Sequence, residues 1–164
     1  MSVETWKKEF YPVEAETLAK STALKATEHS LQKWLGLRKK NLKKHDMIVG
    51  GWGDIYSDPG KNSDTASFSI DAESCALCVK FEEKDHIGEN KSESCKTCPL
   101  CRVRGGVSCD TCDSGRKGEY DSPWWSWCGE KKNPEPMIRW LRRAKKMLET
   151  ESAERKAKRE RAKK

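Results

Sequence analysis

The chain has 164 residues, of which 36% are charged and 35% hydrophobic, and its formal net charge is +7. This length suits one ordinary domain or two very small ones, and so thin an apolar core benefits from a bound metal ion. No stretch approaches the ~18 apolar residues of a membrane span, and the first residues lack the apolar segment of a secretory signal. We therefore expect a cytoplasmic protein.

The first third of the chain predicts helices followed by a loop. Residues 1–12 carry aromatic side chains that should anchor an arm on the body, and residues 14–35 predict an amphipathic helix that ends at Gly36. Residues 38–46 predict a short, lysine-rich second helix. Residues 50–65 are rich in Gly, Asp, Asn and Ser and predict a loop, and residues 66–70 alternate as in a short strand.

All eight cysteines lie in one stretch of the middle region. They are Cys75, Cys78, Cys95, Cys98, Cys101, Cys109, Cys112 and Cys128. The spacing CxxC-x16-CxxC is typical of closed, tetrahedral zinc sites, because two thiolates three positions apart can turn toward one ion. The natural first site is Cys75, Cys78, Cys95 and Cys98, which leaves four cysteines for a second ion. A site of Cys75, Cys78, Cys98 and Cys109 is equally compatible with the spacing, so we expect at least one Zn²⁺ and favour two.

Other chemistries for these cysteines fit less well. Four disulfides require an oxidising compartment. The segment CKTCPLC resembles the start of a ferredoxin motif, but the next cysteine follows too late and the proline follows the wrong cysteine. The segment around Asp85, His86 and Asn90 resembles HNH endonucleases, yet no histidine follows Cys98. An all-cysteine zinc site also lacks an open position for water, so we predict no enzyme activity.

Aromatic and basic residues dominate the C-terminal part. Trp124, Trp125 and Trp127 just precede Cys128 and form either a buried plug or an exposed interaction surface. Residues 134–148 predict a helix with a core-facing stripe, and residues 149–164 form a charged tail that is either helical or frayed. Residues 131–164 carry 14 Lys/Arg against 5 Asp/Glu, whereas residues 50–130 carry 9 against 15. The tail is therefore the candidate nucleic-acid contact, through Arg155, Lys156, Lys158, Arg159 and Arg161.

A set of short motifs resembles a known group of proteins. The segments CALC, CKTCPL, GGVSC and SPWWSW, followed by a helix that begins near Met137 and Ile138, are similar to uncharacterised small cysteine-rich proteins of tailed bacteriophages. The common pattern singles out Cys75, Cys78, Cys95, Cys98 and Cys109. The resemblance implies a phage gene product that acts in the host cytoplasm, and it implies no reaction.

Together these features predict a small α+β, mostly helical fold. In it the N- and C-terminal helices pack on an irregular, zinc-stabilised, cysteine-ligated core with short strands. Residues 1–148 would form one domain, with residues 14–46 as its helical part, residues 66–128 as its metal core and residues 134–148 as its last helix. We expect a non-enzymatic accessory or regulatory protein that binds a host or phage protein. The alternative is a nucleic-acid-binding protein that uses the basic helix and tail, with zinc only structural.

Overall fold

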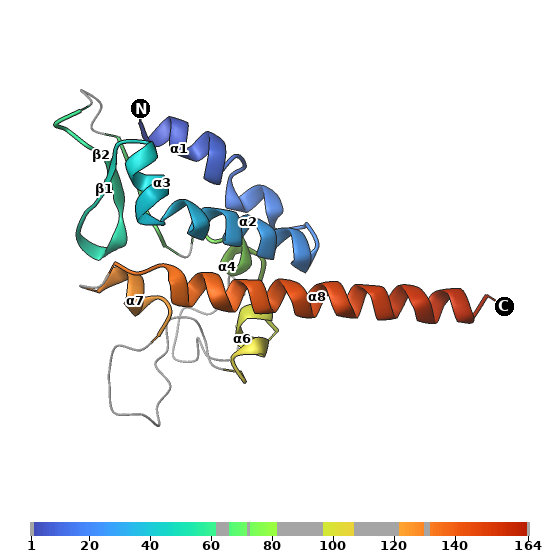
Figure 1. Cartoon of the computed structure of the whole chain (residues 1–164). Helices are drawn as coiled ribbons and strands as arrows, with labels where there is room; N and C mark the ends of the chain where they lie inside the picture. The colour runs from blue at the N-terminus through green and yellow to red at the C-terminus, as the bar shows by residue number, and fades with distance from the viewer. Residues whose placement is uncertain are drawn as a thin grey trace, which may run out of the picture.

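The computed structural model describes residues 2–61, 66–71, 73–81, 97–106, 122–129 and 132–163. These residues are mostly helical and include one short antiparallel sheet, which confirms the small α+β class predicted from the sequence. Figure 1 shows two helices, α2 and α8, lying side by side, with α1, α3 and the sheet beside α2. Within the described residues no helix is both long and apolar enough to cross a membrane.

The N-terminal aromatic residues pack on the body, as predicted, and a short helix carries most of them. Helix α1 (Val3–Phe10) starts with a capping box, in which the Ser2 and Thr5 side chains each bond the backbone of the other. Trp6 is fully buried and donates a hydrogen bond of 3.0 Å from Nε1 to the carbonyl oxygen of Gly36. A side chain at Gly36 would collide with Phe10, because an added Cβ would lie 2.5 Å from its Cγ. The close approach of α1 to the end of the next long helix therefore requires this glycine.

The helix predicted over residues 14–35 is divided in two. Residues Ala15–Leu18 form the 3-10 turn η1, and helix α2 (Ala23–Gly36) starts only after Thr22. The Thr22 hydroxyl accepts a hydrogen bond of 3.2 Å from the backbone nitrogen of Lys25, so a side-chain cap sets the start of α2. The predicted end at Gly36 is confirmed, and α3 (Lys39–Lys44) is the predicted short basic helix.

The sheet is small, and one of the three strands that the structure describes lies within the loop predicted over residues 50–65. Its strands are β1 (Met47–Val49), β2 (Ile55–Ser57) and β3 (Ser67–Phe68), antiparallel in the order β1-β2-β3. Met47 pairs with Ser57, and Ile55 pairs with Phe68. The predicted strand over residues 66–70 is confirmed at β3. Strands β1 and β2 were missed because three residues are too few to show an alternating pattern.

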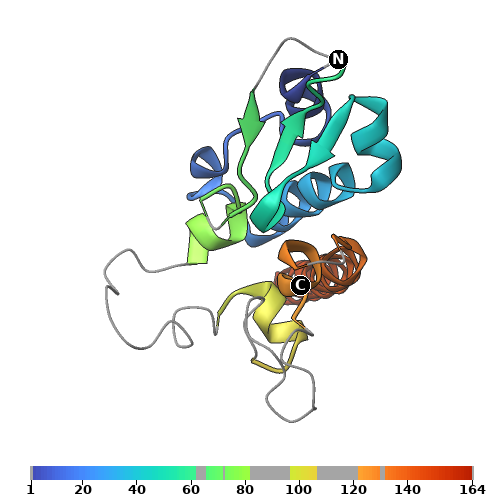
Figure 2. The same cartoon turned by 90° about the vertical axis from the view of Figure 1, so that its left-hand side faces the viewer.

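Short helices and one long helix complete the fold. These are α4 (Ala76–Phe81), α6 (Pro99–Val103), α7 (Trp125–Cys128) and α8 (Glu135–Arg161). Figure 2, which looks along α8, shows the sheet on one side of α2 and the α8–α6 pair on the other. Two ion pairs join α2 and its following residues to α8: Arg38 with Glu135 at 2.7 Å, and Glu28 with Lys145 at 2.9 Å.

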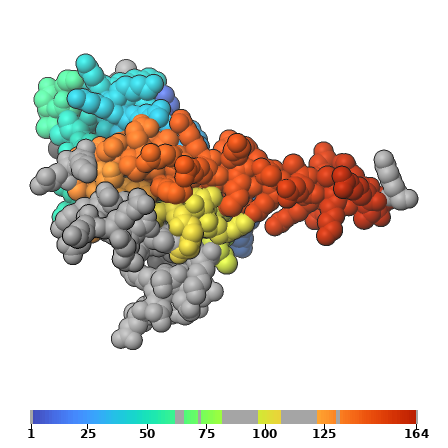
Figure 3. All heavy atoms as spheres, turned by 60° about the horizontal axis from the view of Figure 1, so that its bottom comes forward, coloured from blue at the N-terminus to red at the C-terminus, as the bar shows by residue number. Residues whose placement is uncertain are grey.

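Helix α8 continues without interruption past the predicted limit at residue 148. Its first half buries Met137, Ile138, Leu141 and Ala144 against the body. From residue 152 to residue 161 every side chain is exposed. Figures 1 and 3 show this second half projecting away from the rest of the molecule. Of the two predicted forms of the tail, helical and frayed, the structure shows the helical one. The tail buries no apolar face of its own.

Candidate metal centre

Two CxxC pairs each begin a short helix. Cys75 directly precedes α4, and the backbone nitrogen of Val79 donates a hydrogen bond of 3.0 Å to the Cys75 carbonyl oxygen, so Cys78 lies one helical turn away. A hydrogen bond from the Cys78 thiol is the largest cause that holds the pKa of Cys75 well below its ordinary value. The two sulfurs of this pair are therefore close neighbours.

The second pair repeats this arrangement on α6. Cys98 is the residue before Pro99, which occupies the first position of the helix, and Cys101 lies in the same helical turn. A hydrogen bond from Cys101 is the largest cause that lowers the pKa of Cys98. Helix α6 packs against α8 and helix α4 packs against α2, and α2 and α8 lie side by side (Figure 1). Cys98 and Cys101 are both buried.

Two polar side chains of α2 lie near Cys75. The Ser30 hydroxyl lies 3.7 Å from the sulfur of Cys75, at hydrogen-bonding distance for sulfur. The Lys33 side chain is fully buried, and its Nζ donates hydrogen bonds of 2.7 Å to the Ser74 carbonyl oxygen and 3.0 Å to the Ser74 hydroxyl. The Lys33 ammonium also lowers the pKa of Cys75. A buried cation is costly without a nearby anion, so this lysine favours thiolate at Cys75.

Cys128 lies in a different environment. It ends α7 and is buried, and burial raises the pKa of its thiol to about 11. Its sulfur faces the turn between β1 and β2, where a Cβ added to Gly53 would lie 3.4 Å from it. Cys128 therefore packs against this turn.

The sulfur pairs remain separate in this structure. Among the described residues, no three His, Cys, Asp or Glu side chains come close enough to share one metal ion. Cys95, Cys109 and Cys112 lie outside the described residues, as do Asp85, His86 and Asn90 of the HNH-like segment. Of the sequence-predicted first site, the structure therefore describes Cys75, Cys78 and Cys98. It places Cys101, which the spacing left for a second ion, beside Cys98.

Of the three tryptophans, one is buried and two are half-buried. Trp127 is fully buried and donates a hydrogen bond of 2.9 Å from Nε1 to the Gly53 carbonyl oxygen. Trp124 and Trp125 are half-buried, and the rings of Trp124 and Trp127 both pack edge-on against Trp34. Trp127 therefore offers no exposed ring to a partner. The five basic residues proposed for the tail, Arg155 to Arg161, are all exposed on α8.

Sequence reasoning missed the residues that surround the cysteine pairs. Ser30 and Lys33 are three positions apart on α2, and their role depends on the packing of α4 against that helix. The sequence did offer one signal for this site: Lys33 lies on the core-facing side of the predicted amphipathic helix. Comparisons with models of protein families, with curated proteins and with solved structures found no match to this chain. The assignment of this site therefore depends on the geometry of its residues alone.

Proposed function

We propose that the chain is a non-enzymatic, zinc-stabilised binding protein in which Cys75, Cys78, Cys98 and Cys101 hold one Zn²⁺ ion. The carrying observation is the presence of two thiol pairs, each in one turn of a short helix, on helices that pack against the neighbouring pair α2 and α8. Four thiolates form the closed tetrahedral set that structural zinc prefers. In this proposal the ion draws the two pairs together and clamps α4 to α6.

The surroundings of the cysteines support thiolate ligands. Zinc binds the deprotonated sulfur, and four thiolates around one Zn²⁺ leave a net negative charge in the interior. The buried Lys33 ammonium and the Ser30 hydroxyl lie on the side of Cys75 where they would offset that charge. The proposed ion has no open position for water, so its role is to stabilise the fold.

Metal content tests this centre directly. Protein purified without chelator should contain zinc, and Cys75→Ala or Cys98→Ala should each remove roughly one equivalent, since a closed site needs all four ligands. Both variants should also melt at a lower temperature than the parent. Cys128→Ala is the matched control, because it removes a buried thiol outside the proposed site and should retain that equivalent. An unchanged zinc content in Cys75→Ala and Cys98→Ala would contradict the proposal, as would iron in place of zinc in the parent.

The proposed role of the stabilised body is to bind another macromolecule, with a host or phage protein as the first candidate. Recovery of one protein from infected cells with a variant truncated after residue 152, insensitive to salt, supports this role. The truncation removes only exposed residues of α8 and leaves Glu151, whose carboxylate pairs with Arg102. If neither the truncated variant nor the full-length chain recovers a protein, this role is contradicted.

Nucleic-acid binding is the second candidate, and the projecting half of α8 favours it. That segment presents Arg155, Lys156, Lys158, Arg159 and Arg161 to solvent and buries nothing. Phosphate contacts of this kind release counterions, so affinity should fall steeply with salt. Truncation after residue 152 should weaken binding to duplex DNA and reduce the salt dependence. Equal affinity of the truncated and full chains at every salt concentration would exclude this role for the tail.

A further inference from the structure

An exposed tryptophan occupies the tip of the β1–β2 connection. Trp52 lies in the turn η2 (Gly51–Gly53) and is 76% exposed. Its backbone has φ 51° and ψ 9°, a left-handed conformation that bulky side chains seldom adopt. Strained conformations of this kind persist where the surrounding structure enforces them, and they concentrate at binding sites.

Hydrogen bonds hold the backbone of this turn. The backbone nitrogen of Gly50 donates a hydrogen bond of 2.8 Å to the Asp54 carbonyl oxygen. The backbone nitrogen of Asp54 donates a hydrogen bond of 3.3 Å to the Gly51 carbonyl oxygen. The carbonyl oxygen of Gly53 accepts the 2.9 Å hydrogen bond from buried Trp127. Because the turn is bonded within itself and to the core beneath it, Trp52 is presented to solvent by a rigid support.

A groove of about 420 Å³ lies beside this turn. Val49 and Trp127 both line it, and both are joined to the turn, Val49 through β1 and Trp127 through its bond to Gly53. Its floor is apolar, since Leu37 and Met47 are also part of the lining. This volume falls within the range of small-ligand sites, which take a ring or a short chain.

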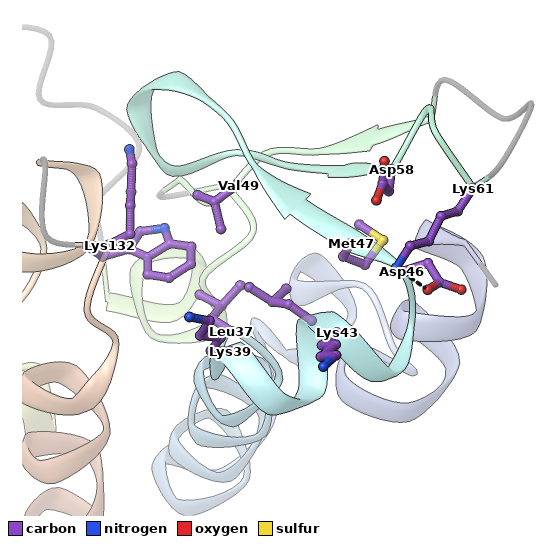
Figure 4. A pocket seen from close by; sticks show the side chains of 11 residues that line it. Leu37, Lys39, Lys43, Asp46, Met47, Val49, Asp58, Lys61 and Lys132 are labelled. Carbon is purple, nitrogen blue, oxygen red and sulfur yellow. Dashed lines mark hydrogen bonds and ion pairs between the residues drawn. The ribbon is translucent and has the colours of Figure 1, made fainter.

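Positive charge surrounds the groove. Figure 4 shows Lys132 at one end, Lys39 and Lys43 along the α3 side, and Lys61 with Asp46 at the other end. Lys61 pairs with Asp46 at 3.2 Å, and Asp58 is the second acidic residue of the lining. Lys39 and Lys43 have no ion pair with any other described residue. The α3 side therefore carries charge that is available to an anionic ligand.

We propose that Trp52 and the lysine-lined groove bind single-stranded nucleic acid, with a base stacked on the exposed indole and adjacent phosphates on Lys39, Lys43 and Lys132. An aromatic face next to lysines is the combination that single strands use, because every base offers a flat π-surface and every linkage a charge. A duplex keeps its bases paired and offers no free face to Trp52. This site is separate from the zinc centre and from the projecting half of α8.

Fluorescence anisotropy of a labelled oligothymidylate with the full-length protein tests the site. Trp52→Ala should weaken binding about tenfold through the loss of stacking, and Trp52→Phe should restore part of the affinity. The double variant Lys39→Glu/Lys43→Glu should weaken binding at least about tenfold and reduce the salt dependence. The matched control is Lys20→Glu/Lys25→Glu, which changes the net charge equally at two exposed lysines outside the groove and outside the projecting half of α8.

The outcomes separate this proposal from general electrostatic attraction. A large loss in the Trp52 and α3 variants, with a much smaller loss in the Lys20→Glu/Lys25→Glu control, supports the groove. Equal losses in the two charge variants with no effect of Trp52→Ala would overturn it, as would the absence of oligothymidylate binding by the parent. Tighter binding of a polyglutamate peptide than of oligothymidylate would overturn it too and would assign the groove to an acidic protein. Zinc content, measured separately, decides the metal centre.

Discussion

Trp127 donates a hydrogen bond of 2.9 Å from its indole nitrogen to the carbonyl oxygen of Gly53, 74 positions earlier in the chain. The bond joins the turn between β1 and β2 to the helix that carries Cys128. Gly53 has φ 89°, and an added Cβ would lie 2.5 Å from the same indole nitrogen. Both the backbone conformation and the close approach therefore require glycine at this position.

Gly53→Ala should lower the free energy of unfolding by about 2 kcal/mol or more, because it adds left-handed strain to a collision with a buried ring. Gly51→Ala is the matched control in the same turn, since no atom lies within 4 Å of a Cβ added there. It should change stability by less than about 0.5 kcal/mol. Urea unfolding of the two variants measures the difference, and similar losses in both would contradict the assigned packing.

Lys33→Met should have different effects on the metal-free protein and on the zinc-loaded protein. In the metal-free chain the change removes a costly buried charge but also the two hydrogen bonds to Ser74, so its net effect on unfolding should be small. With four thiolates around an ion, the same change removes a compensating charge, so zinc should leave to a chelator about tenfold faster, within the range for outer-shell changes. The measurements are unfolding of the chelated protein and the rate of zinc release. Lys25→Met, exposed on the same helix, should change neither, and unaltered release from Lys33→Met would contradict the assigned role.

The Arg38–Glu135 pair should contribute modestly to the attachment of α8. The guanidinium donates two hydrogen bonds to the carboxylate, of 2.7 and 3.0 Å, and Arg38 lowers the pKa of Glu135. A double-mutant cycle with alanine at both positions should give a coupling free energy of about 0.5–1 kcal/mol, since the pair is partly exposed. High salt should reduce it. A coupling near zero at low salt would show that the pair adds nothing to the α2–α8 packing.

Tyr11 should make the protein sensitive to alkali. Its hydroxyl accepts a hydrogen bond of 2.9 Å from the backbone nitrogen of Ala15, and burial raises the pKa of the phenol to about 12. The fold therefore favours the neutral phenol, so the stabilisation is complete below pH 10, the ordinary pKa of tyrosine, and is lost as the pH rises toward 12. The stability advantage of the parent over Tyr11→Phe in urea unfolding should shrink across this interval. An advantage that stays constant from pH 9 to pH 12 would contradict the raised pKa.

Local features of the sequence were sufficient to predict several helices. The end of α2 at Gly36, the short basic helix after it and the long C-terminal helix all follow from patterns within one segment, which short-range interactions determine. The grouping of cysteines in CxxC pairs is local in the same sense. The start of α2 was missed because the apolar spacing continues into residues 15–18, whereas the Thr22 cap begins a new helix.

The amino-acid sequence by itself determined that the chain is helical, carries paired thiols and ends in a basic segment, because residues a few positions apart decide each of these features. Only the tertiary structure brought Lys33 and Ser30 to the first thiol pair, buried Trp127 against Gly53 and left Trp52 exposed beside a lysine-lined groove. Those arrangements join residues that are distant in the chain. They depend on how α2, α8 and the sheet pack, and no local pattern encodes which distant partner a side chain will meet.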